Sequence, residues 1–312
     1  MGSILAYYLI GKLVRQLRKQ RGMTQEELAD GILSRTNLSR LENGEQLPHK
    51  DKLDVLLQRL GLNSHEAYSH YLSVKEFDFS VKCDDILSLI ANNKNEEAET
   101  LIDELSAFPE FNEGIKKQLL LSYRAFIMIN LKQDNYEIRK FILEALQITI
   151  KSFSEKYISD YFLSDQETRL INALSITYLN DNNLVKAIEI LEKLKESFEA
   201  SKIDEEQKFK LYSLVLFNLS KYYGLNKRYS DAVNICDYAK ELCLKTNNMR
   251  RLPGFIYNKA YNLCESGHKE ECIPLLYQAY YGFDMMEDNY RSNIVKNHAK
   301  EKHGIDFDEN NC

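Results

Sequence analysis

The sequence predicts an all-α protein with two regions, a small N-terminal helical domain and a larger C-terminal array of helix pairs. Residues 11–61 place apolar side chains at three- and four-residue spacings between glycines and capping residues. Beyond residue 80 the chain has few prolines and divides into helical segments separated by Asn-, Asp- and Lys-rich turns. A length of 312 residues also exceeds the usual size of one core. We therefore expect domains at 1–62 and 81–312, joined by a linker helix at 63–80.

The N-terminal domain contains the signals of four short helices. The first, GKLVRQLRKQR, carries its leucines and valine on one face and ends at Gly22. Thr24 and Glu27 have the spacing of a capping box that opens a second helix. Ser34 is placed to cap a third helix, SRTNLSRLE, and a fourth helix follows Pro48 and stops at Gly61. This order predicts a helix-turn-helix unit with its supporting helices.

The third helix is the predicted DNA-reading element, because its leucines face the core and its polar residues face away. Its first turn offers an arginine, a threonine and an asparagine, which suit guanine, a thymine methyl group and adenine respectively. A glutamine at the start of the second helix, an arginine one turn later on the third helix and a lysine on the fourth suit phosphates. The predicted DNA-contacting residues are Gln25, Arg35, Thr36, Asn37, Arg40 and Lys50. For the lysine, a solvated surface charge is an equally good interpretation.

The segments TQEELA and SRTNLSRLENG resemble the phage-repressor and Xre class of helix-turn-helix domains, a lambda-repressor-like fold whose recognition helix lies in the major groove. The connection between Ala29 and Leu38 is one residue shorter than in typical phage repressors. The Rgg and PlcR (RRNPP) group of peptide-sensing regulators has the same shortening, and the chain resembles this group more closely. The resemblance implies an internal salt bridge between Arg18 and Glu42.

The C-terminal region contains five recurring turns, and the helix after each turn has one aligned position, which is a small residue in every copy except the second. TYLNDNNLVKAIEIL, YYGLNKRYSDAVNIC and LCESGHKEECIPLL align well, and two weaker copies precede them. The aligned positions are Ala98, Arg139, Ala187, Ala232 and Cys272. The pattern is similar to tetratricopeptide repeats (TPR), although the spacing is longer, as in the Rgg and PlcR group. A TPR-like α-solenoid with a concave groove is therefore expected, and such grooves bind peptides.

Three asparagines recur on the first helices of these pairs. Asn218 and Asn258 both precede their small residue by 14 positions, and Asn172 differs by one. In the related peptide sensors an asparagine here holds the ligand backbone, and a carboxamide can both donate to and accept from a peptide bond. Tyr222 and Tyr261 lie nearby and could line pockets for apolar ligand side chains. The alternatives are that each asparagine bridges two helices and that the tyrosines are repeat core.

Composition excludes several other classes of protein. Residues 1–75 contain 11 Lys and Arg and 8 Asp and Glu, a net charge of +3. The rest of the chain contains 30 Lys and Arg and 39 Asp and Glu, a net charge of −9. Only the N-terminal part therefore suits binding to nucleic acid. No apolar stretch reaches the length of a membrane span and no signal peptide is evident, which predicts a cytoplasmic protein. The six cysteines form no CxxC pair and are expected to be reduced and structural, with no metal site and no cofactor. No catalytic motif was found, so an enzyme is not expected.

These observations and the resemblance together predict a homodimeric transcription regulator of the quorum-sensing type. Its helix-turn-helix domain would read an inverted-repeat operator in double-stranded DNA, and its repeat domain would be the receptor for a short peptide pheromone. One alternative is a phage or plasmid repressor of the same architecture. Another is a TPR-type interaction scaffold that holds a response regulator or another protein.

Overall fold

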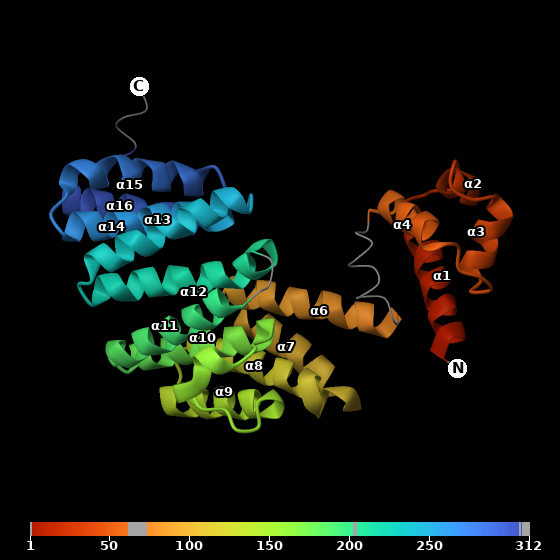
Figure 1. Cartoon of the computed structure of the whole chain (residues 1–312), viewed down its shortest axis with the longest axis horizontal. Helices are drawn as coiled ribbons and strands as arrows, with labels where there is room; N and C mark the ends of the chain where they lie inside the picture. Colours follow the sequence, from red (N-terminus) through yellow and green to blue (C-terminus); the bar gives the residue numbers. More distant parts are fainter. Residues whose placement is uncertain (1, 62–73, 202–204, 306, 308–312) are drawn as a thin grey trace. The chain divides into compact units, whose positions relative to one another are not determined.

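The structure is a computed structural model that describes residues 2–61, 74–201, 205–305 and 307 (Figure 1). Within these residues the regular elements are all α- or 3₁₀-helices, which confirms the predicted all-α class. None of the described helices is long and apolar enough to cross a membrane. Contacts divide the chain into two units, 1–107 and 108–312, which are described separately below.

The first unit begins with four helices that pack around one small core. They are α1 (Gly2–Gln20), α2 (Gln25–Ala29), α3 (Arg35–Glu42) and α4 (Lys50–Arg59). The buried core residues are Val14, Leu28, Ala29, Leu38, Leu41, Leu53, Leu56, Leu57 and Leu60. The spacing of the leucines therefore correctly predicted which faces of α1, α3 and α4 point into the core. Val55, which lies on α4 between these leucines, is exposed. The first part of the predicted linker helix at 63–80 lies outside the described residues, which omit 62–73.

The predicted capping residues open α2 and α3. The Glu27 N–H donates to Thr24 Oγ1 at 3.1 Å, and the Thr24 N–H donates to Glu27 Oε2 at 2.6 Å, so the capping box is confirmed. Ser34 Oγ accepts from the Asn37 N–H at 3.2 Å at the start of α3. These side chains satisfy backbone donors that a helix start leaves without partners. The beginning of each helix is thus fixed locally, and with it the turn between them.

A glycine sets the approach of α1 to α3. A side-chain carbon at Gly11 would overlap the carbonyl oxygen of Leu41, which is backbone and cannot turn away. The absence of a side chain at this point lets the two helices pack at close range.

Two more helices complete the first unit, α6 (Val74–Ala91) and α7 (Asn95–Ser106). They form the first of the predicted helix pairs, and Ala98 is fully buried between them as expected for the small position. Lys82 Nζ contacts Glu104 Oε2 at 2.5 Å across the pair. The contacts group the α6–α7 pair with the first unit. The domain boundaries predicted at 62 and 80 stay predictions.

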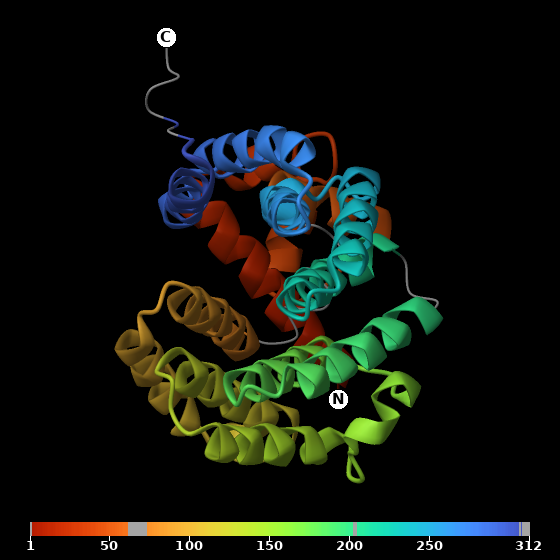
Figure 2. The same cartoon turned by 90° about the vertical axis from the view of Figure 1, so that its left-hand side faces the viewer.

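The second unit consists of consecutive antiparallel helices (Figures 1 and 2). Its elements are η1 (Pro109–Phe111), α8 (Gly114–Asn130), α9 (Asn135–Thr149), η2 (Glu155–Asp160), α10 (Asp165–Asn180), α11 (Leu184–Ala200), α12 (Glu205–Leu225), α13 (Tyr229–Lys245), η3 (Met249–Arg251), α14 (Leu252–Glu265), α15 (Lys269–Asp284) and α16 (Asn289–His303). Each helix packs against the next, and the first helices of successive pairs, α8, α10, α12 and α14, also contact one another. This is the layered arrangement of a helical repeat array, so the predicted repeat architecture is confirmed.

The five predicted turns share one backbone device. Each contains one residue in the left-handed region, and in four of the five turns this residue comes directly before the N-cap of the next helix. These residues are Asn93, Lys132, Asn182, Lys227 and Gly267. Asparagine tolerates this conformation better than most residues, which explains the Asn-rich turns.

One predicted alignment is wrong. The turn before α9 has an additional residue, because its N-cap is Asp134 while the left-handed residue is Lys132. Ile138, not Arg139, is therefore four residues after the N-cap, and it is fully buried. The Arg139 guanidinium instead reaches Asp181 at 2.6 Å and lies over the ring of Tyr178.

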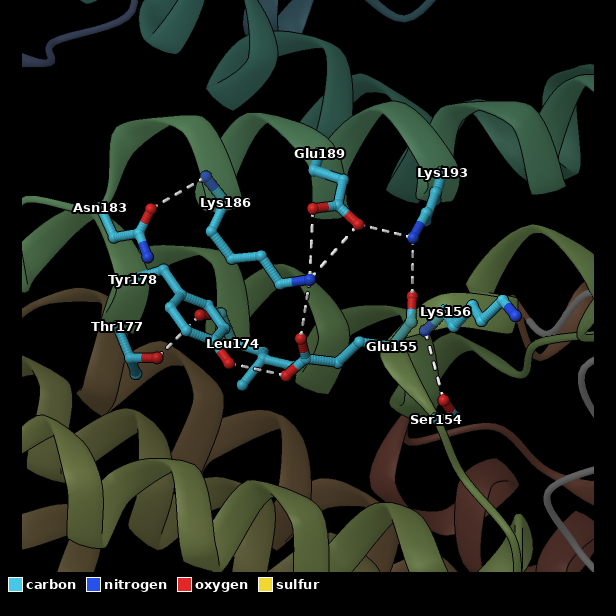
Figure 3. A network of polar contacts seen from close by, with 10 residues as sticks. All are labelled: Ser154, Glu155, Lys156, Leu174, Thr177, Tyr178, Asn183, Lys186, Glu189 and Lys193. Carbon is cyan, nitrogen blue, oxygen red and sulfur yellow. Dashed lines mark hydrogen bonds and ion pairs between the residues drawn. The ribbon is translucent and has the colours of Figure 1, made fainter.

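A polar network holds η2 against the α10–α11 pair (Figure 3). The Glu155 carboxylate accepts from the Tyr178 hydroxyl at 2.8 Å and pairs with Lys186 Nζ at 3.2 Å. Glu189 bonds both Lys186 and Lys193, at 3.2 and 2.6 Å, and Lys193 also donates to the Glu155 carbonyl oxygen. Burial and the neighbouring Glu155 carboxylate raise the pKa of Tyr178 to about 12, so the phenol stays protonated and continues to donate.

Candidate nucleic-acid and peptide sites

The helix-turn-helix unit is held together by a buried ion pair. Arg18 Nε and Nη2 donate to the two carboxylate oxygens of Glu42 at 2.5 and 2.9 Å, which confirms the salt bridge that the family resemblance implied. Arg18 Nη1 also donates to the Met23 carbonyl oxygen at 2.8 Å, in the turn before α2. Burial acts to raise the pKa of Glu42, but the bonds from Arg18 and Gln25 outweigh it and leave the pKa lowered. The pair therefore joins α1, α3 and the intervening turn as ions.

Gln25 is part of this network. Its Nε2 donates to Glu42 Oε2 at 2.9 Å, and the residue is only partly exposed at the start of α2. A primary amide has two N–H groups, so the bond to Glu42 leaves a second donor and fixes the orientation of the amide. The predicted phosphate contact of Gln25 stays a prediction, with Glu42 as the residue that would position it.

The start of α3 presents the predicted reading residues together. Arg35, Thr36, Asn37 and Arg40 are all exposed, whereas Leu38 on the same helix is buried. Arg35 Nη1 lies 3.1 Å from Glu26 Oε1, and both side chains are about two-thirds exposed, so this ion pair can be exchanged for another partner at small cost. Lys50 is the first residue of α4, and its side chain lies outside the described part of the chain.

The recurring asparagines lie along the first helices of three successive pairs and connect them. Asn218 Nδ2 on α12 donates to Asn172 Oδ1 on α10 at 2.8 Å. Asn258 Nδ2 on α14 donates to Ser220 Oγ at 2.8 Å and to the Phe217 carbonyl oxygen at 3.3 Å, both on α12. Asn172 and Asn258 are buried, whereas Asn218 is partly exposed. The structure thus contains the helix-bridging bonds, and Asn218 is the member of the set with surface available for a ligand.

The two predicted peptide-contacting tyrosines, Tyr222 and Tyr261, also differ in exposure. Tyr222 is 2% exposed, and burial raises its pKa to about 12. Tyr261 is partly exposed, and its ring lies 5.3 Å from the ring of His298 on α16. Of the two, Tyr261 is therefore better placed to contact a ligand, and Tyr222 is part of the repeat core.

A group of arginines near these asparagines was not predicted. Burial, followed by the charges of Arg291, Arg250 and Arg169, lowers the pKa of Arg251 to about 10. Arg251 and Arg291 line a cavity of about 60 Å³ together with Phe217, Gly254 and Phe283. The charges of arginines from α10, η3 and α16 thus act on Arg251, and an anion in the cavity would be attracted by Arg251 and Arg291, the latter of which also pairs with Asp288 at 3.3 Å. These residues are far apart in the sequence, so spacing gave no signal.

The arginine group and the asparagines share one helix, α10. Asn172 follows Arg169 by three residues on α10, which is about one helical turn, and Asn218 directly follows Phe217 on α12. Asn218 is thus one residue away from Phe217, which lines the cavity beside Arg251.

The cysteines agree only in part with the expected reduced state. Cys236 and Cys243 on α13 are buried thiols, and burial raises their pKa to about 12 and about 11, which makes them unreactive. Cys264 and Cys272 are instead joined as a disulfide between α14 and α15.

A helix-turn-helix family model (HTH_3) matches residues 14–66, the segment that contains the α1–α4 core. This match confirms the predicted helix-turn-helix domain. A comparison with curated protein sequences found no match.

Three solved structures with the same architecture extend over nearly the whole chain. PlcR from Bacillus thuringiensis, in complex with the peptide PapR7 and DNA, is 21% identical with a TM-score of 0.63, and the match covers 92% of this chain and 99% of PlcR. The pheromone receptor Rgg2 from Streptococcus dysgalactiae is 17% identical with a TM-score of 0.54, covering 94% and 99%. The apo form of the competence regulator ComR from Streptococcus vestibularis is 15% identical with a TM-score of 0.50, covering 96% and 99%. At these identities the matches show the fold, and they confirm the predicted resemblance to the Rgg and PlcR group at that level.

Proposed function

We propose that the protein is a cytoplasmic, dimeric transcription regulator that reads an operator through α3 and changes its DNA affinity when a short peptide binds its repeat domain. The observation that carries the DNA-binding part is the exposed first turn of α3, where Arg35, Thr36 and Asn37 project from a rigid, capped helix. Recognition helices of this class place their N-terminal residues against base edges in the major groove. The likeness to PlcR, which binds both a peptide and DNA, supports the same pairing of activities here.

The DNA-binding proposal is tested with operators selected from a random pool of double-stranded DNA by the full-length protein. Arg35→Ala and Asn37→Ala should each relax the preference at one or two bases, at a cost of roughly 1–3 kcal/mol for the best site. Lys19→Ala removes an exposed charge from α1, outside the proposed reading surface, and serves as the control. Unchanged base preference in both α3 variants would exclude them as readers.

Selected operators also test the proposed dimer. One domain of this class reads a half-site, so a two-fold dimer selects inverted repeats with half-sites about one helical turn apart. Sedimentation of the free protein should show a dimer. Selection of single half-sites by a monomer would contradict the proposal.

For the repeat domain we propose a peptide site between Asn218 and the arginine group. The Asn218 carboxamide would bond the peptide backbone, and Arg251 and Arg291 would hold a carboxylate, such as the peptide's C-terminus. Phe217 and Phe283 line the same cavity and offer apolar contact beside the charge. An Arg-lined, partly buried pocket favours an anion because its charges are weakly screened there.

The test is calorimetry with short peptides fractionated from the native culture medium. Asn218→Ala and Arg251→Ala should weaken binding, whereas Asn234→Ala, which changes an exposed asparagine on α13, should not. Amidation of the peptide C-terminus should weaken binding to the wild type and have little further effect on Arg251→Ala. Equal affinity of the wild type and both variants would rule out this site. No binding of any peptide would favour the interaction-scaffold alternative.

A further inference from the structure

Three residues at the end of the repeat array bring sulfur and imidazole ligands together. Cys264 is near the end of α14, Cys272 is in the first turns of α15, and their Cα atoms are 5.4 Å apart. His303 is the last residue of α16. One ligand atom from each of the three lies within 4.8 Å of the other two. Within the described part of the chain, this is the group of His, Cys, Asp and Glu side chains that could hold a metal ion.

The surrounding imidazoles lack the partners that buried polar groups normally have. His303 Nε2 is buried and has no hydrogen-bond partner among the described residues, and the same holds for both ring nitrogens of His298. The two rings are 5.5 Å apart on α16. Unpaired buried polar atoms are uncommon in folded proteins, and a bound ion is one of the few explanations for several of them in one place.

We propose that Cys264, Cys272 and His303, in the reduced protein, bind a borderline-soft divalent cation of the Zn²⁺ type. Two thiolates and an imidazole are the ligands that zinc prefers, at about 2.3 Å to sulfur and about 2.0 Å to nitrogen. In a tetrahedral site with these bond lengths, neighbouring ligand atoms are separated by roughly 3.3–3.8 Å. A ligand nitrogen of His303 is already within 4.8 Å of both sulfurs, and the two sulfurs can move apart to this spacing once the disulfide is reduced. The fourth position goes to solvent, and the ring of His298 lies 5.5 Å from the ring of His303.

The disulfide and the metal exclude each other. Opening the Cys264–Cys272 bond consumes two electrons and two protons, which a low-molecular-weight thiol supplies while it becomes a disulfide itself. Zn²⁺ then replaces the two thiol protons and leaves both cysteines as thiolates. Cytosolic thiols are normally kept reduced, so the metal-binding state is the one expected in the cell.

The site has a structural consequence for the last helices. His303 closes α16, and the metal would join this end of α16 to the turn between α14 and α15. His298, on the same helix, packs edge-on against Tyr257 of α14 at 5.7 Å, and its ring is tilted against the ring of Tyr261 at 5.3 Å. Binding of the ion should therefore stabilise α14–α16 against unfolding.

The experiment uses untagged full-length protein, reduced with a phosphine, freed of metal and titrated with Co²⁺ and then Zn²⁺. We expect one equivalent of Co²⁺ to produce a thiolate-to-cobalt charge-transfer band and tetrahedral d–d bands, and Zn²⁺ to displace it and raise the melting temperature. Cys272→Ser and His303→Gln should lower the affinity by more than about 100-fold, because each removes a direct ligand. Cys243→Ser removes a buried thiol on α13 and should bind normally.

Three results would overturn the proposal. The first is a reduced wild type that binds neither cation. The second is wild-type affinity in both Cys272→Ser and His303→Gln, and the third is an equal loss in Cys243→Ser. His303→Gln is at a partly exposed helix end, so its circular dichroism spectrum should match the wild type and separate loss of a ligand from loss of fold.

Discussion

Replacing Glu42 by glutamine should destabilise the helix-turn-helix unit more than replacing any exposed charged residue of that unit. Glu42 is 3% exposed and Arg18 is 9% exposed, so the glutamine would leave a buried guanidinium without its counter-ion. Removing one partner of a buried pair costs about 3–5 kcal/mol. Glutamine keeps the shape and one acceptor oxygen, so we expect a value near the lower end, about 3 kcal/mol. That value corresponds to about a 100-fold change in the opening equilibrium.

The assay is native-state hydrogen exchange on the full-length protein, read at the buried backbone amides of α2 and α3. Amides of Leu28, Leu38 and Leu41 should exchange about 100-fold faster in Glu42→Gln at neutral pH. Glu45→Gln is the matched control, because Glu45 is exposed on the same segment and its replacement should change stability by less than about 0.5 kcal/mol. Equal exchange in the wild type and Glu42→Gln would refute the argument that this pair stabilises the unit.

The stability difference between the wild type and Glu42→Gln should also depend on pH in a defined direction. The pKa of Glu42 is lowered in the folded protein from its ordinary value of 4.5, so the unfolded chain binds the proton more readily. The contribution of the charge is therefore fully present above pH 4.5 and is lost as the pH falls through the lowered folded value. The difference between wild type and Glu42→Gln should be constant near neutral pH and should narrow on acidification. A difference that widened in acid would contradict the assignment of an ionised Glu42.

Four further substitutions test local features of the fold. Ser34→Ala removes the N-cap of α3 and should cost about 1 kcal/mol, seen as faster exchange in its first turn; unchanged exchange would show that the cap is not needed. Gly11→Ala should cost about 1–3 kcal/mol, because the added carbon overlaps the Leu41 carbonyl oxygen, and an unchanged melting temperature would contradict the close α1–α3 packing. Ile138→Ala should lower the free energy of unfolding by about 2–5 kcal/mol, and Arg139→Ala should lower it clearly less, as measured by urea unfolding. A larger loss in Arg139→Ala would favour the alignment that was predicted from the sequence.

The N-terminal unit could be predicted in detail because its determinants are local. Thr24, Glu27 and Ser34 act on backbone groups three residues away, and Gly22 occupies a left-handed position that the spacing already required. The repeat array was predicted for the same reason, since each turn carries its own signal. The one misalignment arose where an extra residue in the turn before α9 shifted the buried position to Ile138.

The candidate sites were less predictable because they depend on contacts between distant helices. The arginine group combines Arg169, Arg250, Arg251 and Arg291, and no periodicity relates residues on α10, η3 and α16. Cys264, Cys272 and His303 likewise have no recognised ligand spacing, and their proximity follows from how α16 packs on the α14–α15 pair. The asparagines were found by their recurrence, but sequence did not show that they bond neighbouring helices.

Those helix-bridging bonds bear directly on how a peptide could alter the protein. In the proposed regulator, Asn218 would exchange its bond to Asn172 for bonds to the peptide backbone, so binding would weaken one link between α12 and α10 while it adds contacts of its own. A ligand shifts a conformational equilibrium only by its difference in affinity for the two arrangements. One hydrogen bond contributes about 0.5–1.5 kcal/mol net, and coupling between sites is typically about 1–3 kcal/mol. Exchange of two or three such bonds along the first helices of the pairs would therefore suffice to couple peptide binding to the spacing of the repeats.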